Sequence, residues 1–180
     1  MKKTFLPESF QEKYKKIMTD EFDEFIKYST KKIRKSIWVN SLKIDSKKLN
    51  ESLEKQNWKL NQLDFSENAF LIEQGPVKPG QSNEFIQGYF NLHEISSMLP
   101  AIVLNPNANE LVLDCCAAPG NKTLQLSCLM QGKGHLIALD KNLERIKALK
   151  FNARKFGMNN VDSRIMDLLK FDFKEKFDKI

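Results

Sequence analysis

Three aspartates stand at the ends of successive apolar segments in the second half of the chain: Asp114, Asp140 and Asp167. In a parallel sheet with helices on both faces, such strand ends open onto one crevice where ligands bind. A carboxylate at the end of the second strand can accept hydrogen bonds from both hydroxyls of a ribose, and the next one can accept from the amino group of an adenine. The pattern predicts a cofactor that contains adenosine. The alternative is that these carboxylates only cap strands and helices.

The loop after Asp114 is built from small residues with one proline and one glycine, Cys115–Gly120. Gly120 lets the backbone approach a ligand closely. A dinucleotide needs several open N–H groups around its pyrophosphate, as in the pattern G-x-G-x-x-G. Here Gly120 is the loop's only glycine, and Pro119 has no N–H to offer. The loop therefore favours S-adenosylmethionine, which carries no phosphate, over NAD.

The segments that must position these aspartates alternate between strand and helix patterns from residue 110 onward. Short apolar runs predict strands, and apolar residues at three- and four-residue spacing predict helices. This alternation predicts a parallel sheet with right-handed crossovers. The expected elements are strands at 111–114, 135–140 and 161–166, helices at 122–130 and 143–156, and the start of a fourth strand at 177–180.

The first half of the chain has another order of elements. Apolar residues at helical spacing predict a helix over 8–28, followed by a basic link at 31–35. A β-α-β-β order comes next, which predicts a small α+β module. The expected elements are strands at 36–42, 58–60 and 69–72, a helix at 47–56 capped by Asp45 or Ser46, a strand within 85–90, and a helix from His93 to Leu104 that Pro100 kinks or ends.

Composition narrows the class of protein. The net charge of +6 and a pI near 9.1 are compatible with a polyanionic partner such as RNA, or with a lysine-rich surface that serves solubility. Three cysteines without a C-x-x-C pair give no support for a zinc site or a redox motif, so we expect no metal, reduced thiols and a cytoplasmic protein. No apolar run approaches the length of a membrane span, and the basic N-terminus does not resemble a signal peptide.

The run Cys116–Thr123, Cys-Ala-Ala-Pro-Gly-Asn-Lys-Thr, closely resembles the signature loop of the Sun/Fmu family of S-adenosylmethionine-dependent RNA cytosine-C5 methyltransferases. The resemblance extends to Ser96–Pro100 and Val39–Lys43 and is greatest to archaeal-type members. By this resemblance the family's cofactor residues carry over to Cys116, Ala117, Ala118, Pro119, Gly120, Asn121 and Lys122 at the methionine end, to Asp140 at the ribose, to Arg145 on the next helix and to Asp167 at the adenine.

The resemblance implies the fold class α/β, with an incomplete Rossmann-like methyltransferase sheet that contains its first three to four strands. A small α+β module, similar to an RNA-recognition fold, is expected to precede this sheet. Residues 1–33 are then an N-terminal helix and basic link, 34–92 the RNA-binding-like module, and 93–180 the N-terminal part of the methyltransferase domain. The implied partner is tRNA or rRNA, and likeness to the archaeal-type members favours tRNA slightly.

The catalytic step is expected outside this sequence. Because C5 of cytosine is a poor nucleophile, an enzyme must first add a thiolate to C6 of an accessible base. The resemblance implies that the nucleophilic cysteine, a second cysteine that helps to release product and an aspartate that holds the cytosine follow the fourth and fifth strands, beyond Ile180. We therefore expect a fragment of a longer enzyme, or one half of a split one with a separately encoded C-terminal half, that does not methylate RNA alone.

Two other functions stay open at this point. The chain could be a non-catalytic RNA-binding or assembly protein that keeps a methyltransferase-like fold, or part of a methyltransferase with another acceptor. Among the remaining side chains, Cys115 and Cys128 are expected to act as small hydrophobic residues. Trp38 stands where relatives often carry arginine and is expected in the core. His93 replaces a frequent glutamine of the family and is expected to make a polar contact under the cofactor domain.

Overall fold

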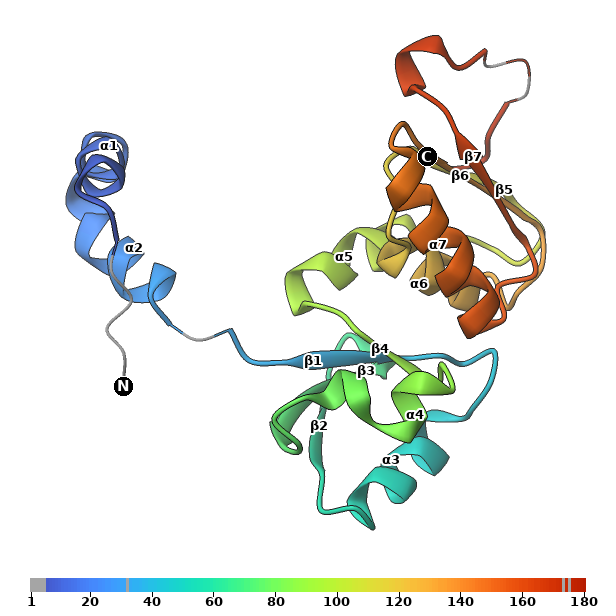
Figure 1. Ribbon diagram of the computed structural model, residues 1–180, viewed down its shortest axis with the longest axis horizontal. Coiled ribbons are helices and arrows are strands. Elements are labelled where there is room, and N and C mark those ends of the chain that lie inside the picture. The colour runs from blue at the N-terminus through green and yellow to red at the C-terminus, as the bar shows by residue number, and fades with distance from the viewer. Residues whose placement is uncertain (1–5, 32, 173, 175) are drawn as a thin grey trace. The chain divides into compact units, whose positions relative to one another are not determined.

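The computed structural model describes residues 6–31, 33–172, 174 and 176–180 (Figure 1). Lys32, in the predicted basic link, lies outside the described residues. The chain divides into two compact units, Met1–Arg34 and Lys35–Ile180. None of the helices within the described ranges is long and apolar enough to cross a membrane.

The first unit is a pair of short helices. Its elements are α1 (Glu8–Met18), η1 (Thr19–Glu21) and α2 (Phe22–Ser29). The prediction of one helix over 8–28 is wrong, because α1 ends at Thr19, whose φ of 44° lies outside the helical region. A threonine disfavours a helix interior only weakly, so the apolar periodicity does not show this break. The two helices contact through aromatic rings: the centroid of Tyr14 lies 4.4 Å from that of Phe10 and 4.9 Å from that of Phe25.

The second unit begins with an antiparallel sheet of four strands in the order β2-β3-β1-β4. The elements are β1 (Ser36–Val39), α3 (Ser46–Glu54), β2 (Lys59–Leu63), β3 (Ser66–Gln74) and β4 (Phe90–Leu92), so the predicted β-α-β-β order is observed. Asp45 caps α3, because its carboxylate accepts hydrogen bonds from Lys47 N and Lys48 N at 3.0 and 3.2 Å. The core between α3 and the sheet includes Leu49, Leu53, Ile37, Val39, Phe70 and Phe90.

The segment between β3 and β4 differs from the predicted strand within 85–90. It contains η2 (Pro79–Gln81) and the single helical turn α4 (Asn83–Ile86). Ser82 caps α4, because its hydroxyl oxygen accepts from Phe85 N at 3.3 Å. Gly88, with a φ of 74°, then turns the chain, and the strand begins only at Phe90.

α5 (Ile95–Leu104) connects the two sheets and continues through Pro100. Of the two predicted outcomes, an end at Pro100 is therefore wrong. The proline costs the helix one backbone hydrogen bond, but it does not stop the helix. α5 ends instead at Asn105, which adopts a left-handed φ of 44°, a conformation that asparagine tolerates at helix ends.

A parallel sheet in the order β5-β6-β7 follows α5. Its elements are β5 (Leu111–Asp114), α6 (Asn121–Leu129), β6 (His135–Asp140), α7 (Leu143–Phe156), β7 (Val161–Ile165) and η3 (Leu168–Lys170). The predicted alternation is confirmed, and the fold is α/β. Lys179 forms a parallel bridge with Val112 on the edge of β5 away from β6, where a fourth strand is predicted to begin.

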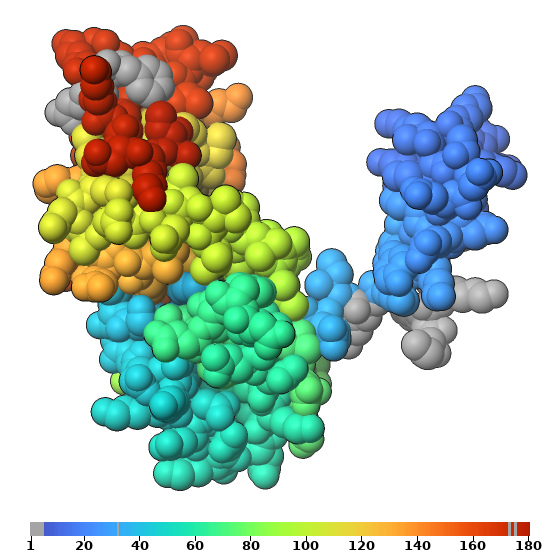
Figure 2. Space-filling model, turned by 180° about the vertical axis from the view of Figure 1, so that it is seen from behind, coloured from blue at the N-terminus to red at the C-terminus, as the bar shows by residue number. Residues whose placement is uncertain are grey.

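Asn40, in the turn after β1, joins the two halves of the second unit, which Figure 2 shows in continuous contact. Its side chain is fully buried, and its amide donates hydrogen bonds to the carbonyls of Gly88 and Phe156, each at 2.8 Å. Its oxygen accepts from Leu42 N at 3.2 Å and from the Cys128 thiol at 3.5 Å. One carboxamide thus contacts the antiparallel module, the end of α7 and α6.

Lys43 strengthens this junction. Its ammonium donates to the carbonyls of Gln87 at 2.9 Å and Lys155 at 2.6 Å. The carbonyls of Lys155 and Phe156 belong to the last turn of α7, which has no partners for them within the helix. A cation at this end also interacts favourably with the helix dipole. Asn40 and Lys43, both from the segment Val39–Lys43, therefore cap α7 from outside the parallel sheet.

Replacing Asn40 with alanine is expected to lower the free energy of unfolding by about 2–4 kcal/mol, because two buried carbonyls lose their donor. A urea titration measures this change. Asn61→Ala is the matched control: Asn61 is exposed on β2, so its loss should change stability by less than about 0.5 kcal/mol. Equal effects of the two substitutions would contradict the role assigned to Asn40.

Candidate cofactor site

The loop between β5 and α6 is tied to its neighbours by short hydrogen bonds. Ala117 N donates to a main-chain carbonyl of β6 at 2.8 Å. The Thr123 hydroxyl donates to Asp114 Oδ2 at 2.8 Å, so the first turn of α6 is fixed to the end of β5. Ala117 and Ala118 are buried, whereas Cys116 is exposed. The loop is therefore held in place by its neighbours, with Cys116 exposed and Cys115 partly buried.

Gly120 occupies a position that a side chain would disturb. Its φ is 109°, a conformation that residues with a Cβ rarely adopt. A Cβ at this position would lie 2.6 Å from Cδ1 of the buried Leu149 in α7. Asn152, also in α7, donates to the carbonyl of Pro119 at 2.8 Å. The absence of a side chain at Gly120 therefore permits both the turn and the close approach of α7 to the loop.

Asp140 is the buried carboxylate at the end of β6, and its side chain is only 4% exposed. Oδ1 accepts from Asn142 N at 2.9 Å, at the start of α7. Oδ2 accepts no hydrogen bond, and Arg145 Nη1 lies 3.1 Å from it as an ion pair. Arg145 also donates to the carbonyl of Ala118 in the loop. A buried carboxylate oxygen without a hydrogen bond is unusual in a folded protein and is suited to a ligand hydroxyl.

Asp114 shares an electrostatic environment with Asp140. Burial raises the pKa of the Asp114 carboxyl above its ordinary value of 3.8, and the negative charge of Asp140 raises it further. Hydrogen bonds from Thr123 and from Cys116 N, together with the charge of Lys122, act in the opposite direction. The structure thus brings Asp114, Asp140 and Lys122 together around the loop.

Asp167 follows β7 and lies beside the end of β6, because Met166 N donates to the carbonyl of Asp140 at 3.0 Å. Its side chain is partly buried, and Oδ1 accepts from Leu169 N at 3.1 Å as the cap of η3. Asp167 therefore caps a helix, which was the alternative role for these aspartates, and it also lies at the crevice.

The first turn of α6 borders a hollow in the parallel half of the unit. Gly120 provides no side-chain cap, so the N–H groups of Asn121 and Lys122 have no capping partner. A cavity of 260 Å³ lies beside them, between α5, β5 and α6. Asp114, Cys116 and Lys122 line it together with apolar residues of α5. Residues predicted for the methionine end of the cofactor therefore adjoin space for part of a ligand.

His93 is a feature of the site that sequence reasoning described incompletely. The residue is only 3% exposed, and neither ring nitrogen has a hydrogen-bond partner of normal geometry. Burial, followed by the charge of Lys122, lowers the pKa of the imidazole to about 4; the backbone of Ser97 lies close enough to oppose the shift in part. The ring is therefore neutral at neutral pH and lies near a lysine that resemblance assigns to the cofactor.

The cysteines differ in their surroundings. Cys128 is buried, as predicted, and Cys115 packs against the apolar cluster of Leu113 and Ile137. Burial raises the pKa of both thiols, and the charge of Asp114 adds to the shift at Cys115. Both are therefore poor sources of thiolate at neutral pH. Trp38 is also in the core, as predicted. Within the described ranges, no three His, Cys, Asp or Glu side chains gather as metal ligands would.

Two family models match the chain over neighbouring ranges. Residues 6–94 match the N-terminal domain of 16S rRNA methyltransferase RsmF, and residues 101–180 match 16S rRNA methyltransferase RsmB/F. The chain belongs to the Sun/Fmu family. The signature loop, Asp140 and the capping segment that holds α7 are thus parts of a Sun/Fmu domain.

Curated relatives in the Sun/Fmu family include the ribosomal RNA small subunit methyltransferase F of Vibrio vulnificus strain YJ016. It is 38% identical over 162 residues, which are 87% of this chain and 34% of the relative. The protein of the same name from Shewanella piezotolerans is 38% identical over 143 residues, 77% of this chain and 30% of the relative. The chain therefore spans about a third of the length of the curated relatives it matches.

Solved structures agree with the Sun/Fmu assignment of the fold. PH0851 superposes with a TM-score of 0.81 at 32% identity, covering 91% of this chain and 37% of that one. A methyltransferase homolog from Pyrococcus horikoshii gives a TM-score of 0.81 at 27% identity, covering 91% of this chain and 54% of that one. The predicted Rossmann-like sheet preceded by an N-terminal module is confirmed.

The buried His93 predicts a pH dependence of stability. In the unfolded chain its imidazole binds a proton below its ordinary pKa of 6.5, whereas in the folded chain it stays neutral down to about 4. Stability is therefore present above pH 6.5 and is lost as pH falls towards 4, by up to about 3 kcal/mol. Urea unfolding at pH 7.5 and 4.5 should show this loss in the wild type and not in His93→Gln. Parallel losses in both proteins would contradict the neutral buried imidazole.

Proposed function

We propose that this chain is the cofactor-binding part and N-terminal module of an S-adenosylmethionine-dependent RNA cytosine-C5 methyltransferase. In this proposal residues 93–180 bind the cofactor and residues 34–92 contribute to RNA binding, after an N-terminal helical segment, 1–33. The curated relatives are named for ribosomal RNA of the small subunit, which supports rRNA rather than the tRNA that archaeal likeness favours.

Asp140 carries the cofactor part of the proposal. Its Oδ2 is buried and accepts no hydrogen bond, at the strand end where a ribose hydroxyl would approach. The negative charges of Asp114 and Asp140 also oppose a pyrophosphate, which supports a cofactor without phosphate groups over NAD. The residues present therefore fit an adenosine-containing, phosphate-free cofactor.

The remaining site residues have distinct roles in this proposal. Arg145 orients the Asp140 carboxylate and holds the loop through the Ala118 carbonyl. Cys116, Ala117, Ala118, Pro119, Gly120, Asn121 and Lys122 surround the methionine end. Lys122 would balance the cofactor's carboxylate, and Asp167 would accept from the adenine amino group. When bound, S-adenosylmethionine supplies an activated methyl group.

The nucleophile that activates cytosine is proposed to lie outside residues 1–180. Two of the three thiols, those of Cys115 and Cys128, have raised pKa values, which supports this because the thiolate is the form that attacks C6. The third, Cys116, belongs in this proposal to the residues around the cofactor. In the proposal, what this chain contributes is binding and orientation. It fixes the cofactor crevice, excludes water from the Asp140 carboxylate and presents a basic protein to RNA.

Asp140→Ala is expected to raise the dissociation constant for S-adenosylmethionine by about 10- to 100-fold, because a ribose hydroxyl loses a charged, buried acceptor. Isothermal titration calorimetry measures the constant. Asp162→Ala is the control, since Asp162 is an exposed carboxylate on the neighbouring strand β7. An unchanged constant in a folded Asp140→Ala variant would contradict the cofactor assignment.

The RNA part of the proposal needs the full-length protein. With 16S rRNA transcript and S-adenosylmethionine, mass spectrometry of the digested RNA is expected to find 5-methylcytosine, and the 180-residue chain alone is expected to produce none. A methyl group on another atom would contradict the proposed reaction. Turnover by the short chain would contradict the placement of the nucleophile.

A further inference from the structure

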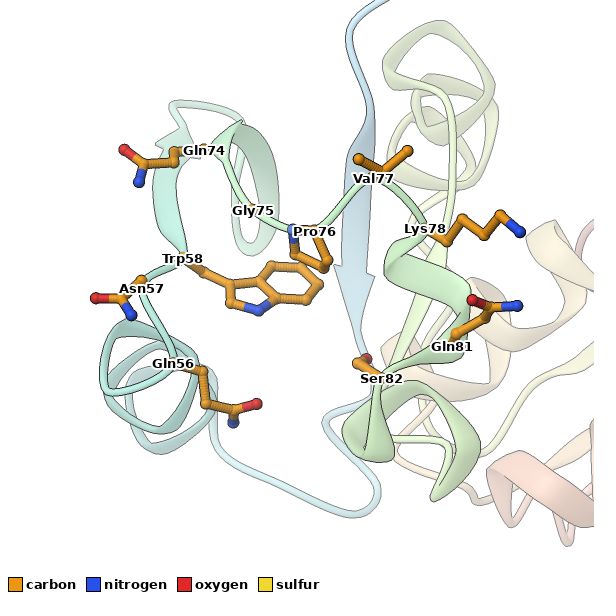
Figure 3. Close-up of a pocket in the computed structure, with 10 residues that line it drawn as sticks. All are labelled: Gln56, Asn57, Trp58, Gln74, Gly75, Pro76, Val77, Lys78, Gln81 and Ser82. Atoms are coloured by element: carbon orange, nitrogen blue, oxygen red, sulfur yellow. The ribbon is translucent and has the colours of Figure 1, made fainter.

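A second cavity, of 710 Å³, lies in the antiparallel module (Figure 3). It opens between the segment that joins α3 to β2 and the segment that leads from β3 through η2 to α4. Figure 3 shows the indole of Trp58 at its centre, with Gly75 and Pro76 on one side and Gln56 and Ser82 on the other. It shares no lining residue with the hollow beside the loop at Asp114. Its volume is in the range of small-molecule sites, roughly 300–1,000 Å³.

The wall of this pocket is already formed without a ligand. Gly75 lies against Trp58, because a Cβ on Gly75 would come within 3.3 Å of indole carbons Cδ2 and Cε3. The Lys35 ammonium donates to the carbonyl of Val77, and Ser82 N donates to the carbonyl of Pro79 at 3.1 Å. A ligand would therefore bind without ordering this segment first, which saves entropy on association.

Three polar groups around the indole have defined hydrogen-bonding character. Gln56 Nε2 donates to Glu84 Oε1 at 2.6 Å and to the Ser52 carbonyl at 3.2 Å. Because both partners are acceptors, the amide orientation is fixed and Gln56 Oε1 remains an acceptor. The Trp58 N–H donates to no group among the described residues. The Ser82 oxygen accepts the cap bond of α4, and its own hydrogen is available to donate.

The side-chain amides of Asn57, Gln74 and Gln81 also line the pocket, but Figure 3 shows them directed away from the indole. The groups around the indole are thus two donors and one acceptor, which match a ligand edge with two acceptors and one donor. Uracil presents O2, N3–H and O4, and cytosine presents O2, N3 and the N4 amino group. Adenine presents one acceptor and one donor on the same edge, and guanine presents one acceptor and two donors. Unpaired RNA bases are commonly recognised along this edge. The hydrogen-bonding pattern therefore favours a pyrimidine.

The charge around the pocket suits a nucleotide. Lys78 lies on the rim, with its side chain directed away from the indole, and its ammonium makes no ion pair or hydrogen bond among the described residues. No aspartate or glutamate lines the pocket. The Glu84 carboxylate contacts Gln56 but does not itself line the pocket, so a phosphate at the rim would meet the Lys78 ammonium first.

On these grounds, and resting on the proposed RNA substrate, we propose that this pocket binds one unpaired pyrimidine nucleotide of the RNA, separate from the cytosine to be methylated. The site would fix the register of the RNA on the antiparallel module, while the Asn40 junction holds that module against the parallel sheet.

Photocrosslinking locates the site directly. The 180-residue chain is irradiated with an octauridylate that carries one 5-iodouracil, and crosslinked peptides are identified by mass spectrometry. Crosslinks at Trp58 or within 74–82 are expected. Crosslinks confined to other segments, or no RNA binding at all, would overturn the proposal.

Affinity measurements test the chemistry of the pocket by fluorescence anisotropy. Octauridylate should bind about tenfold more tightly than octaadenylate. The variant Trp58→Phe removes the N–H but keeps an aromatic ring, and it should weaken octauridylate binding about three- to tenfold. Lys78→Ala should also weaken octauridylate binding about three- to tenfold. Lys47→Ala, at an exposed position on α3, is the matched control and should change the affinity for octauridylate less than about twofold. Since Lys78 is exposed, this variant tests the proposal even if Trp58→Phe unfolds.

Two results would overturn the proposal independently of these variants. Equal affinity for octauridylate and octaadenylate would exclude recognition of a pyrimidine edge. Binding of a polyglutamate peptide as tight as that of octauridylate would mean that the chain attracts negative charge only. Either result would leave the proposed function intact if the full-length protein still makes 5-methylcytosine, so the two failures are distinguishable.

Discussion

The capping of α7 by Asn40 and Lys43 is the interaction on which the arrangement of the second unit depends. The last carbonyls of this helix lack partners of their own, and the antiparallel module supplies donors for them. The other end of α7 borders the candidate cofactor site, where Arg145 contacts the Asp140 carboxylate. Midway along the helix, Leu149 fills the space that the missing side chain of Gly120 leaves. The same helix therefore links the antiparallel module to the loop between β5 and α6.

Two acidic side chains adjoin the loop between β5 and α6, and their proximity costs free energy. Asp140 is buried and Asp114 is partly buried, and their charges disfavour each other. Thr123 and Arg145 offset part of this cost through a hydrogen bond and an ion pair. Such a site favours ligands that donate hydrogen bonds, such as ribose hydroxyls, and disfavours phosphate. The chemistry of the site and the absence of a glycine-rich phosphate loop therefore lead to the same class of cofactor.

Much of the parallel half could be predicted because local signals and packing agree there. The helix 143–156 has an asparagine cap at its start and Gly157 at its end, so the predicted and observed bounds coincide. The first unit was predicted less well. One apolar periodicity covers 8–28, and nothing in it marks the turn at Thr19. The strand predicted within 85–90 is not formed over most of that range. Ser82 caps the helical turn α4 there, and the apolar residues that follow it gave no sign of this cap.

Some features of the candidate site could be predicted from the sequence and others could not. Asp140 is recognisable by its place after a strand, and the geometry adds that one of its oxygens lacks a hydrogen bond. The role of Asn40 could not be predicted, because its partners Gly88 and Phe156 are distant in sequence and are main-chain carbonyls, which carry no sequence signal. The burial of His93 without a partner of normal geometry was likewise invisible. Only its departure from the family's glutamine marked the position.

The most direct test of the account is hydrogen–deuterium exchange of the 180-residue chain with and without S-adenosylmethionine. Binding at the proposed site should slow exchange in the loop 115–123 and at the start of α7, 141–146, while β2 should exchange at an unchanged rate. Because the amides of these segments lie beside Asp114 and Asp140, protection confined to them would locate the ligand at the strand ends. Unchanged exchange in both segments at saturating ligand would contradict the central claim.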